Sequence, residues 1–484
     1  MAKMKRMAIL FIAFVLVLPP LVLVGGCQQQ PTQSRIASER LVAQIDSSWE
    51  IDFETVSAPV SADGKRLAYV ARAAGKCFIV VDGVEGKQYD RIPEATFSPD
   101  SKRVGYRAEV AGKWFVVVDG VEGKQYDGIL WPIFSPDSQR VGYVAKAVGK
   151  HFAVVDGIEG KQYDGILGLT FSPDSKRVGY MAEVAGKWFV VVDGVEGKQY
   201  DGIGTFGHIF SPDSKRVGYM AEVADKWFVV VDGVEGKQYD EIRTPGFVET
   251  VFAPIFSPDS NRVAYWAQLG SKWFMVVDGV EGKKYDNIGT FGHIFSPDSK
   301  RVGYMAEVAG KWFAVVDSVE GKQYDCVFGL VFSPDSKRVA YGAEVAGKWF
   351  VVVDGVEGKQ YDDITGPTFS PDSKRVAYWA QLDSKWFMVV DGVEGKQYDC
   401  IGIFAPIFSF SPDSKRVAYV AGTADKWFVV VDGVEGKQYD RILGPNVSIL
   451  GFTLAGRLIF DSRDSLHYLA ISGNRVYLVE EKIR

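Results

Sequence analysis

Aspartate is the residue type whose repetition in this sequence could do chemistry. Ten copies of "VVD", such as those ending at Asp119 and Asp193, alternate with ten copies of "YD", such as those ending at Asp127 and Asp201. Clustered carboxylates can bind cations or act as acid–base pairs. Catalysis normally needs neighbours that differ from one another, so ten equivalent copies at turns favour a structural role. We expect these aspartates to cap hairpins.

Histidine and cysteine are too few and too scattered to predict a metal site. The four histidines stand at positions 151, 208, 293 and 467, and the first of them replaces the Trp of other repeats. Cysteines 77, 326 and 400 occupy drifted repeat positions and show neither ligand spacing nor a disulfide framework. We predict no metal, no cofactor and no catalytic residue.

The aspartates belong to a repeat of 37 to 46 residues. A weaker first copy begins at Val60 ("VSADGKRLAY"), and an eroded eleventh follows Gly451. Copies of "FSPDSKRVGY" begin at Phe97, Phe134, Phe171, Phe210, Phe256, Phe295, Phe332, Phe369 and Phe410. A period of this length indicates a stack or ring of one small supersecondary unit.

Each repeat is predicted to form four strands. In the second unit these are "ATFS", "RVGYRAEV", "WFVVVD" and "KQYDGIL". Pro99 restricts φ in the first turn, Asp100 can accept hydrogen bonds from nearby backbone, and the Gly pair of "DGVEG" allows a tight hairpin. "WFVVVD" is apolar on both faces, so both must be covered by other sheets. We therefore predict an all-β protein built as a β-propeller, with one four-stranded blade per repeat.

The "FSPDSKRVAY" motif resembles the WD-like propeller repeat of the TolB type, which also occurs in the propeller domains of prolyl oligopeptidases. The resemblance covers residues 57 to 482 and implies a fold more than a function. The full copies here have Ser where the family has Gly after Pro-Asp, and only Gly64 keeps the family residue. We interpret the Ser-Pro-Asp turn as a structural unit of the blade.

Two enzyme classes with propeller folds have sequence marks that are missing here. A prolyl oligopeptidase needs a hydrolase domain with a GxSxG elbow and a catalytic His, and no segment outside the repeats is long enough for one. The Asp box of sialidases needs a Gly and a Trp that "SPDSKRVGY" lacks. We favour a non-enzymatic binding protein. The alternative is a propeller enzyme or glycan-active protein whose site lies among the variable loops.

Eleven repeats allow more than one arrangement. They could form a single large ring, or rings of five and six blades that divide at the longest insertion, Glu241 to Pro254. An open superhelical stack is a third arrangement, because the eroded first and last repeats resemble the capping repeats of such a stack. We favour one continuous array over residues 49–484.

The N-terminus predicts export and lipid attachment. Three basic residues precede the apolar run Ala8 to Val24, which is followed by Gly, Gly and Cys27. The "LVLVGGC" stretch looks like the lipobox of bacterial lipoproteins, which implies cleavage before Cys27 and a lipid on its thiol. Gln28 after the Cys implies sorting to the outer membrane. We predict a signal peptide at 1–26 and a tether at 27–48; a plain signal peptide or a membrane anchor is the alternative.

The net charge argues against a nucleic-acid partner. Removal of residues 1–26, which hold three cationic and no acidic residues, lowers the formal charge from −6 to −9. Binding to nucleic acid needs clustered Lys and Arg. We expect the partner to be an envelope protein or a cell-wall polymer.

Function is expected where the repeats differ. The links from "YD" to the next "FSPD" vary in length and content, and we expect them to open on one face around the propeller axis. Trp266 and Trp379 are expected to extend this variation to another link on that face. The candidate partner-binding residues are Trp131, Phe206, His208, Phe247, Phe252, Phe291, His293, Phe328 and Phe404. An alternative is that these rings are core residues.

Overall fold

The computed structural model describes residues 35–50, 60–204, 210–243, 254–289, 294–401, 408–423, 425–443, 446–449, 452–455 and 458–484. All of them belong to one compact unit, Arg35–Arg484. The elements of this described part are all β-strands. It accordingly includes no helix long and apolar enough to cross a membrane.

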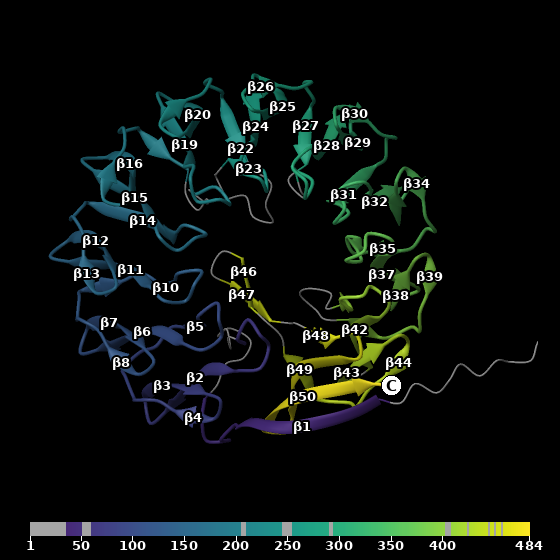
Figure 1. Cartoon of the computed structure of the whole chain (residues 1–484), viewed down its shortest axis with the longest axis horizontal. Coiled ribbons are helices and arrows are strands. Elements are labelled where there is room, and N and C mark those ends of the chain that lie inside the picture. Colours follow the sequence, from purple (N-terminus) through teal and green to yellow (C-terminus); the bar gives the residue numbers. More distant parts are fainter. Residues whose placement is uncertain are drawn as a thin grey trace, which may run out of the picture. The chain divides into compact units, whose positions relative to one another are not determined.

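Apart from the hairpin of β46 and β47, the described strands form eleven antiparallel sheets that stand around a common axis, and we number these blades 1 to 11 (Figure 1). A typical blade has an inner strand, two long central strands and a two-residue outer strand at the circumference. In several blades the inner strand is split into two short pieces that pair with opposite ends of the same central strand. The eleven-bladed propeller expected from the repeats is confirmed.

The first six blades follow one another along the chain. Blade 1 has β2 (Ala68–Ala73), β3 (Lys76–Val81) and β4 (Val84–Glu85); blade 2 has β5 (Ala95–Phe97), β6 (Val104–Val110), β7 (Lys113–Val118) and β8 (Val121–Glu122). Blade 3 has β9 (Gly128–Ile129), β10 (Ile133–Phe134), β11 (Val141–Ala147), β12 (Lys150–Val155) and β13 (Ile158–Glu159). Blade 4 has β14 (Gly165–Phe171), β15 (Val178–Val184), β16 (Lys187–Val192) and β17 (Val195–Glu196). Blade 5 has β18 (Gly202–Ile203), β19 (Gly218–Val223), β20 (Lys226–Val231) and β21 (Val234–Glu235). Blade 6 has β22 (Glu241–Arg243), β23 (Ile255–Phe256), β24 (Val263–Leu269), β25 (Lys272–Val277) and β26 (Val280–Glu281).

The last five blades complete the array. Blade 7 has β27 (Asn287–Gly289), β28 (Gly303–Val308), β29 (Lys311–Val316) and β30 (Val319–Glu320). Blade 8 has β31 (Cys326–Phe332), β32 (Val339–Val345), β33 (Lys348–Val353) and β34 (Val356–Glu357). Blade 9 has β35 (Asp363–Ile364), β36 (Thr368–Phe369), β37 (Val376–Leu382), β38 (Lys385–Val390) and β39 (Val393–Glu394). Blade 10 has β40 (Cys400–Ile401), β41 (Phe408–Phe410), β42 (Val417–Thr423), β43 (Lys426–Val431) and β44 (Val434–Glu435). Blade 11 has β45 (Arg441–Leu443), β48 (Ile459–Ser462), β49 (Ser465–Ser472), β50 (Arg475–Ile483) and β1 (Arg35–Gln44), and a separate hairpin pairs β46 (Asn446–Ile449) with β47 (Phe452–Ala455).

The central strands are buried on both faces, as their apolar sequence predicts. Phe115, Val116 and Val117 of β7 are each at most 4% exposed, although neighbours along a strand point to opposite faces. Phe115 shares a core cluster with Ala68 of blade 1, whereas Val116 shares one with Tyr143 of blade 3. Each blade is therefore held between two others by hydrophobic contact.

The same packing closes the ring. Leu67 and Tyr69 of blade 1 share a core cluster with Leu469 and Leu478 of blade 11. Strand β1 pairs with β50 from Arg35 opposite Ile483 to Gln44 opposite Arg475, with one register shift between Leu41 and Ala43, so the N-terminal strand completes the last blade. The array is a closed ring, and the open stack is wrong.

Blades 5 and 6, on either side of the longest insertion, pack like any other pair of neighbours. Met220 and Val229 of blade 5 share a core cluster with Tyr265 and Phe274 of blade 6. Two separate rings would leave these faces apart, so the division near Glu241 to Pro254 is wrong. The single array that we favoured is the one observed.

The predicted tether also needs correction. Residues 35–44 were assigned to a tether at 27–48, but they form β1 in blade 11. The sequence of this strand, "RIASERLVAQ", lacks the repeat motif, so the repeat pattern did not reveal it. Its pairing partner lies at the opposite end of the chain.

Candidate functional site

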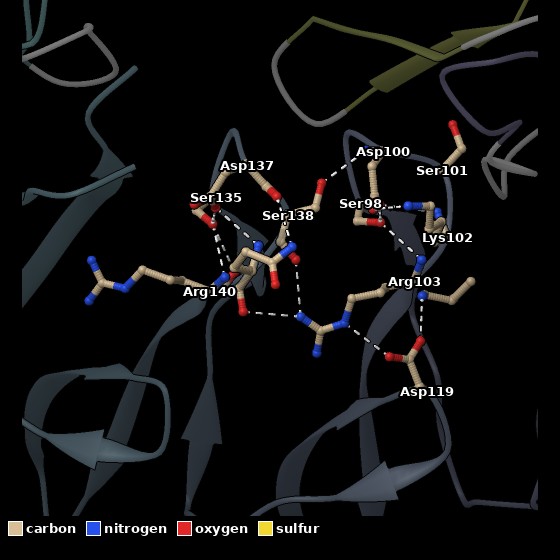
Figure 2. A network of polar contacts seen from close by, with 12 residues as sticks. Ser98, Asp100, Ser101, Lys102, Arg103, Asp119, Ser135, Asp137, Ser138 and Arg140 are labelled. Atoms are coloured by element: carbon tan, nitrogen blue, oxygen red, sulfur yellow. Dashed lines mark hydrogen bonds and ion pairs between the residues drawn. The ribbon is translucent and has the colours of Figure 1, made fainter. Parts of the chain in front are cut away.

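The Ser-Pro-Asp turn of blade 2 joins this blade to blade 3 (Figure 2). In blade 2, Ser98 Oγ donates to Asp100 Oδ1 at 2.6 Å and accepts from the Arg103 backbone N–H at 2.9 Å. The backbone N–H of Asp100 then donates to Ser138 Oγ of blade 3 at 2.9 Å. Hydrogen bonds from the Ser98 hydroxyl and the Lys102 N–H hold the pKa of Asp100 below its usual range. The turn is therefore part of an interface between blades.

An arginine strengthens the same junction. Arg103 Nε donates to Asp119 Oδ2 at 3.0 Å, and Arg103 Nη1 donates to the carbonyl oxygen of Ser138 at 3.1 Å. The guanidinium carbon also lies 5.3 Å from the ring centroid of Phe134 in blade 3. The other carboxylate oxygen of Asp119 accepts from the Val104 N–H at 2.9 Å. The "VVD" aspartate thus caps the start of a central strand rather than a hairpin turn.

We call this set of contacts, defined by Ser98, Asp100, Arg103 and Ser138 in blades 2 and 3, the blade latch. Its central hydrogen bond, from the Asp N–H of one blade to the Ser Oγ of the next, recurs over nine consecutive blade pairs. A contact that holds nearly every pair of neighbours is a structural unit. The interpretation of the Ser-Pro-Asp turn is therefore supported.

The Ser that replaces the family's Gly has a role in the latch. Ser138 has φ of 65°, a left-handed conformation that costs free energy for any residue except Gly. Its hydroxyl is the acceptor that Gly lacks. At the ring's closure, Gly64 keeps the family residue with φ of 70°. A Cβ there would lie 2.8 Å from Ile459 of blade 11.

The "YD" aspartates also connect blades. Asp127 accepts from Lys113 Nζ of blade 2 at 2.6 Å and from the Val148 N–H of the blade 3 hairpin at 2.9 Å. The Lys113 bond, followed by the Val148 bond, holds the pKa of Asp127 below its usual range. These aspartates therefore cap hairpins as predicted, and their carboxylate oxygens are engaged in structural contacts.

Histidine and cysteine form no site in the described residues. His151 is half-buried, with Nδ1 2.9 Å from the Asp164 carbonyl oxygen. His467 is buried at the ring's closure, with Nδ1 2.7 Å from Asp461 Oδ2 and Nε2 2.7 Å from the Asp63 carbonyl oxygen. The described part of the chain contains no group of three His, Cys, Asp or Glu residues able to hold a metal ion. Its three cysteines are free thiols.

The variable link of blade 3 lies on the inner side of the ring. In blade 3, Ile129 pairs with Ala145 and Ile133 pairs with Gly142, so residues 130–132 interrupt the inner strand halfway along it. The inner strand is the part of the blade nearest the axis (Figure 1). The described links are therefore segments of the inner wall, which corrects the expectation of loops on one face. Three residues stand opposite two here, so the strand bulges.

Two of the nine candidate partner-binding residues lie in the described part, and they differ in how far their side chains are exposed. Trp131 is 50% exposed. Phe328 packs edge-on against Trp349, with ring centroids 5.3 Å apart, at the margin of a core cluster. The other seven candidates lie outside the described residues, as does the lipidation site Cys27. These seven are Phe206, His208, Phe247, Phe252, Phe291, His293 and Phe404.

Trp266 and Trp379 require a correction. Both lie in central strands, at 2% and 0% exposure, rather than in a variable link. Trp379 packs edge-on against Tyr419 of the next blade, with centroids 5.1 Å apart. They stand in strand segments that are buried on both faces, so the sequence periodicity does not distinguish them from the neighbouring Ala and Tyr residues.

Sequence reasoning missed two residues beside Trp131. Arg107 Nη1 of β6 donates to the Ile129 carbonyl oxygen at 2.7 Å, and its guanidinium carbon lies 5.8 Å from the Trp131 ring centroid. Arg107 Nε donates to Glu94 Oε1 at 3.1 Å. Burial raises the pKa of Glu94 above its ordinary value, and the Arg107 charge opposes this rise. The sequence alone could have identified Arg107, because this arginine stands where the other repeats have apolar or small residues.

Two surface hollows do not coincide with these residues. One, of about 490 Å³, lies between blades 10 and 11 and is lined by Arg416, Asp464 and Lys482 among others. The other, of about 460 Å³, lies between blades 4 and 5 beside a latch arginine, Arg177. The second is lined by residues that recur in other blades. Neither hollow includes Trp131, so we place the candidate site on the variable inner wall.

Comparisons with known proteins add no function. No family model matches the chain, and no curated protein matches it. A solved structure of a eukaryotic initiation factor aligns over 69% of this chain and 96% of its own, with 12% identity and a TM-score of 0.37. TolB from Acinetobacter baumannii aligns over 66% of this chain and 81% of its own, with 12% identity and a TM-score of 0.26. At these TM-scores neither similarity carries an argument.

Proposed function

We propose that this protein is a non-enzymatic scaffold of the bacterial cell envelope whose β-propeller binds an envelope protein or a cell-wall polymer. One observation carries the proposal. The repeated polar residues are used in contacts between blades, whereas described links that differ between blades, such as residues 130–132, lie on the inner wall. A rigid frame with variable inner residues suits selective binding. No nucleic acid is expected, because the net charge is negative.

A lipid on Cys27 would hold the ring close to the outer membrane. Strand β1 begins at Arg35, eight residues after Cys27. Eight residues span at most about 28 Å even when fully extended. The edge of blade 11 would therefore stay within that distance of the bilayer surface, and the inner wall would meet its partner there.

The anchor is tested by substitution of the lipidated residue. Cys27→Ala should abolish metabolic labelling of the protein with palmitate and should block normal processing, because the thiol is the acceptor of the lipid. The wild-type protein, labelled in parallel, is the control. Unchanged labelling of Cys27→Ala would exclude lipid attachment at this residue.

The binding role is tested by capture from envelope extracts. Replacement of Trp131, Phe206, Phe291 and Phe404 together by Ser should reduce capture of the partner at least about ten-fold and leave the thermal unfolding midpoint nearly unchanged. The matched control replaces Val121, Ile158 and Val195 by Ser. These outer-strand residues are 72–75% exposed, and the change should leave capture intact.

Either of two results would contradict the proposal. If the variant with four aromatic residues replaced unfolds, its aromatic rings belong to the core. If the outer-strand variant alone loses capture, the partner binds the circumference of the ring instead.

A further inference from the structure

Trp131 differs from the other aromatic residues of the described chain. It is the only aromatic side chain among their exposed large apolar residues, whereas the Tyr and Phe rings of the repeats are buried or half-buried between blades. An exposed Trp in a short link between two paired strand segments offers a flat apolar surface that loses little conformational freedom on binding. The residue therefore has the properties of a ligand contact.

Its neighbours fix its surroundings. Arg107 is held by the Ile129 carbonyl oxygen and by Glu94, and it lies beside the indole ring. The Arg107 side chain is 19% exposed and that of Glu94 is 32% exposed, so both reach the surface in part. A second ring, that of Trp114, lies 5.3 Å from the same guanidinium. The arginine is thus immobilised by four groups before any ligand arrives.

This cluster occurs at one position in the ring. The residues equivalent to Arg107 in other repeats are Val70, Val144, Met181, Met220, Trp266, Met305, Gly342, Trp379 and Val420. None of these can supply a charged donor, so the contact of blades 2 and 3 is unlike the others. A single asymmetric cluster on a repeated frame is what a specific contact requires.

The chemistry of the cluster selects an uncharged, hydroxyl-rich ligand. Arg107 and Glu94 neutralise each other, so the cluster has no net charge to attract an ionic group. The negative face of an indole attracts the weakly positive C–H face of a sugar ring. A carboxylate accepts hydrogen bonds from hydroxyl groups, and a guanidinium donates to their oxygens. A pyranose offers all of these features at the right scale.

We propose that Glu94, Arg107 and Trp131 form a subsite for an uncharged pyranose unit of a glycan chain. The inference deepens the proposed function and rests on it, since it assigns the partner to the cell-wall polymers rather than the proteins. Trp131 supplies the stacking surface. Glu94 accepts from ring hydroxyls, and Arg107 positions both side chains.

The test uses the full-length lipidated protein in micelles of a detergent that contains no sugar. Binding of an N-acetylglucosamine tetramer is measured by titration calorimetry. Trp131→Ala should weaken binding at least about ten-fold, and Trp131→Phe should keep most of it because a ring remains. Glu94→Gln should weaken binding about three-fold to ten-fold, since a neutral amide is the poorer acceptor. Val148→Ala, at a 93% exposed position in the same blade, is the matched control and should bind like wild type.

The outcomes separate this inference from the proposed function. Absence of tetramer binding, or equal binding by Trp131→Ala, overturns the subsite. Binding of a proline-rich peptide in place of the tetramer also overturns it and leaves a peptide-binding scaffold. Capture of an envelope partner that is unaffected by Trp131→Ala overturns the subsite while the scaffold stands. If wild-type protein captures no envelope component, the proposed function itself fails.

Discussion

Serine residues in a left-handed conformation are the residue-scale feature on which the blade latch depends. Ser138 accepts a hydrogen bond from the Asp100 N–H, and the same arrangement holds Asp137 of blade 3 to Ser175 of blade 4. Backbone strain at such a residue costs about 1 kcal/mol or more, and the hydrogen bond returns about the same amount. Ser is therefore retained where a Gly would relax the backbone but lose the acceptor.

This balance predicts an order of stability. Ser138→Ala keeps the strain and leaves the Asp100 N–H without its acceptor, so it should lower the free energy of unfolding by about 2 kcal/mol. Ser138→Gly loses the acceptor but relieves the strain, so the loss should be about 1 kcal/mol or less. Urea unfolding followed by tryptophan fluorescence measures both. If the Gly variant is the less stable of the two, the strain argument is wrong.

At the scale of the element, β1 replaces a missing outer contact in blade 11. In the other blades a lysine pairs with the outer-strand glutamate of the next blade, as Lys124 pairs with Glu159, and in several of them a tyrosine such as Tyr126 donates to the same carboxylate. In blade 10 the corresponding Lys437 contacts Glu39 of β1 instead, at 2.7 Å. Strand β1 therefore supplies the glutamate that the outer strand of a following repeat provides in the other blades.

The buried end of β1 gives the second prediction. Arg35 donates to Glu481 at 2.6 Å, with side chains 7% and 2% exposed, and Glu481 also accepts from Tyr468. Arg35→Ala should destabilise the protein by about 3–5 kcal/mol, because a buried carboxylate would lose its counter-charge. Arg40→Ala, at an exposed position of the same strand, should change stability by less than about 0.5 kcal/mol. Thermal unfolding followed by circular dichroism compares them, and equal effects would show that the ion pair contributes little.

The whole molecule is a single ring, because each blade has an apolar face that only the next blade can cover. The core cluster of blades 5 and 6 and the closing cluster of blades 11 and 1 are built from the same kinds of residue. Cutting the ring at any place would expose two of these faces. Stability is thus shared around the ring.

This sharing predicts that halves of the propeller cannot fold alone. Residues 57–240 and 255–484, expressed separately, should aggregate or remain unfolded, because each half would expose two blade faces and the second would lack β1. The two halves of the full chain should unfold together in one transition rather than independently. Calorimetry and size-exclusion chromatography of both fragments provide the measurement, with the intact protein as control. Two soluble, cooperatively melting halves would contradict the shared-ring account.

The sequence by itself determined the blade. The four strands, the Ser-Pro-Asp turn and the capping role of Asp127 could be predicted, because their signals act within one repeat or its neighbour. Repetition also strengthened each strand and turn prediction, since an ambiguous copy of the repeat could be compared with nine others. The same local regularity made the number of repeats countable.

Only the tertiary structure decided how the blades meet. The pairing of β1 with β50 joins residues more than 400 positions apart, and no local pattern marks it. Trp266 and Trp379 were misplaced because their sequence neighbours do not show which blade covers them. Glu94 directly precedes the inner strand β5, Arg107 lies in the central strand β6, and Trp131 lies in the bulge of the next blade. Their meeting depends on the angle between neighbouring sheets, which is set by packing around the whole ring rather than by any one repeat.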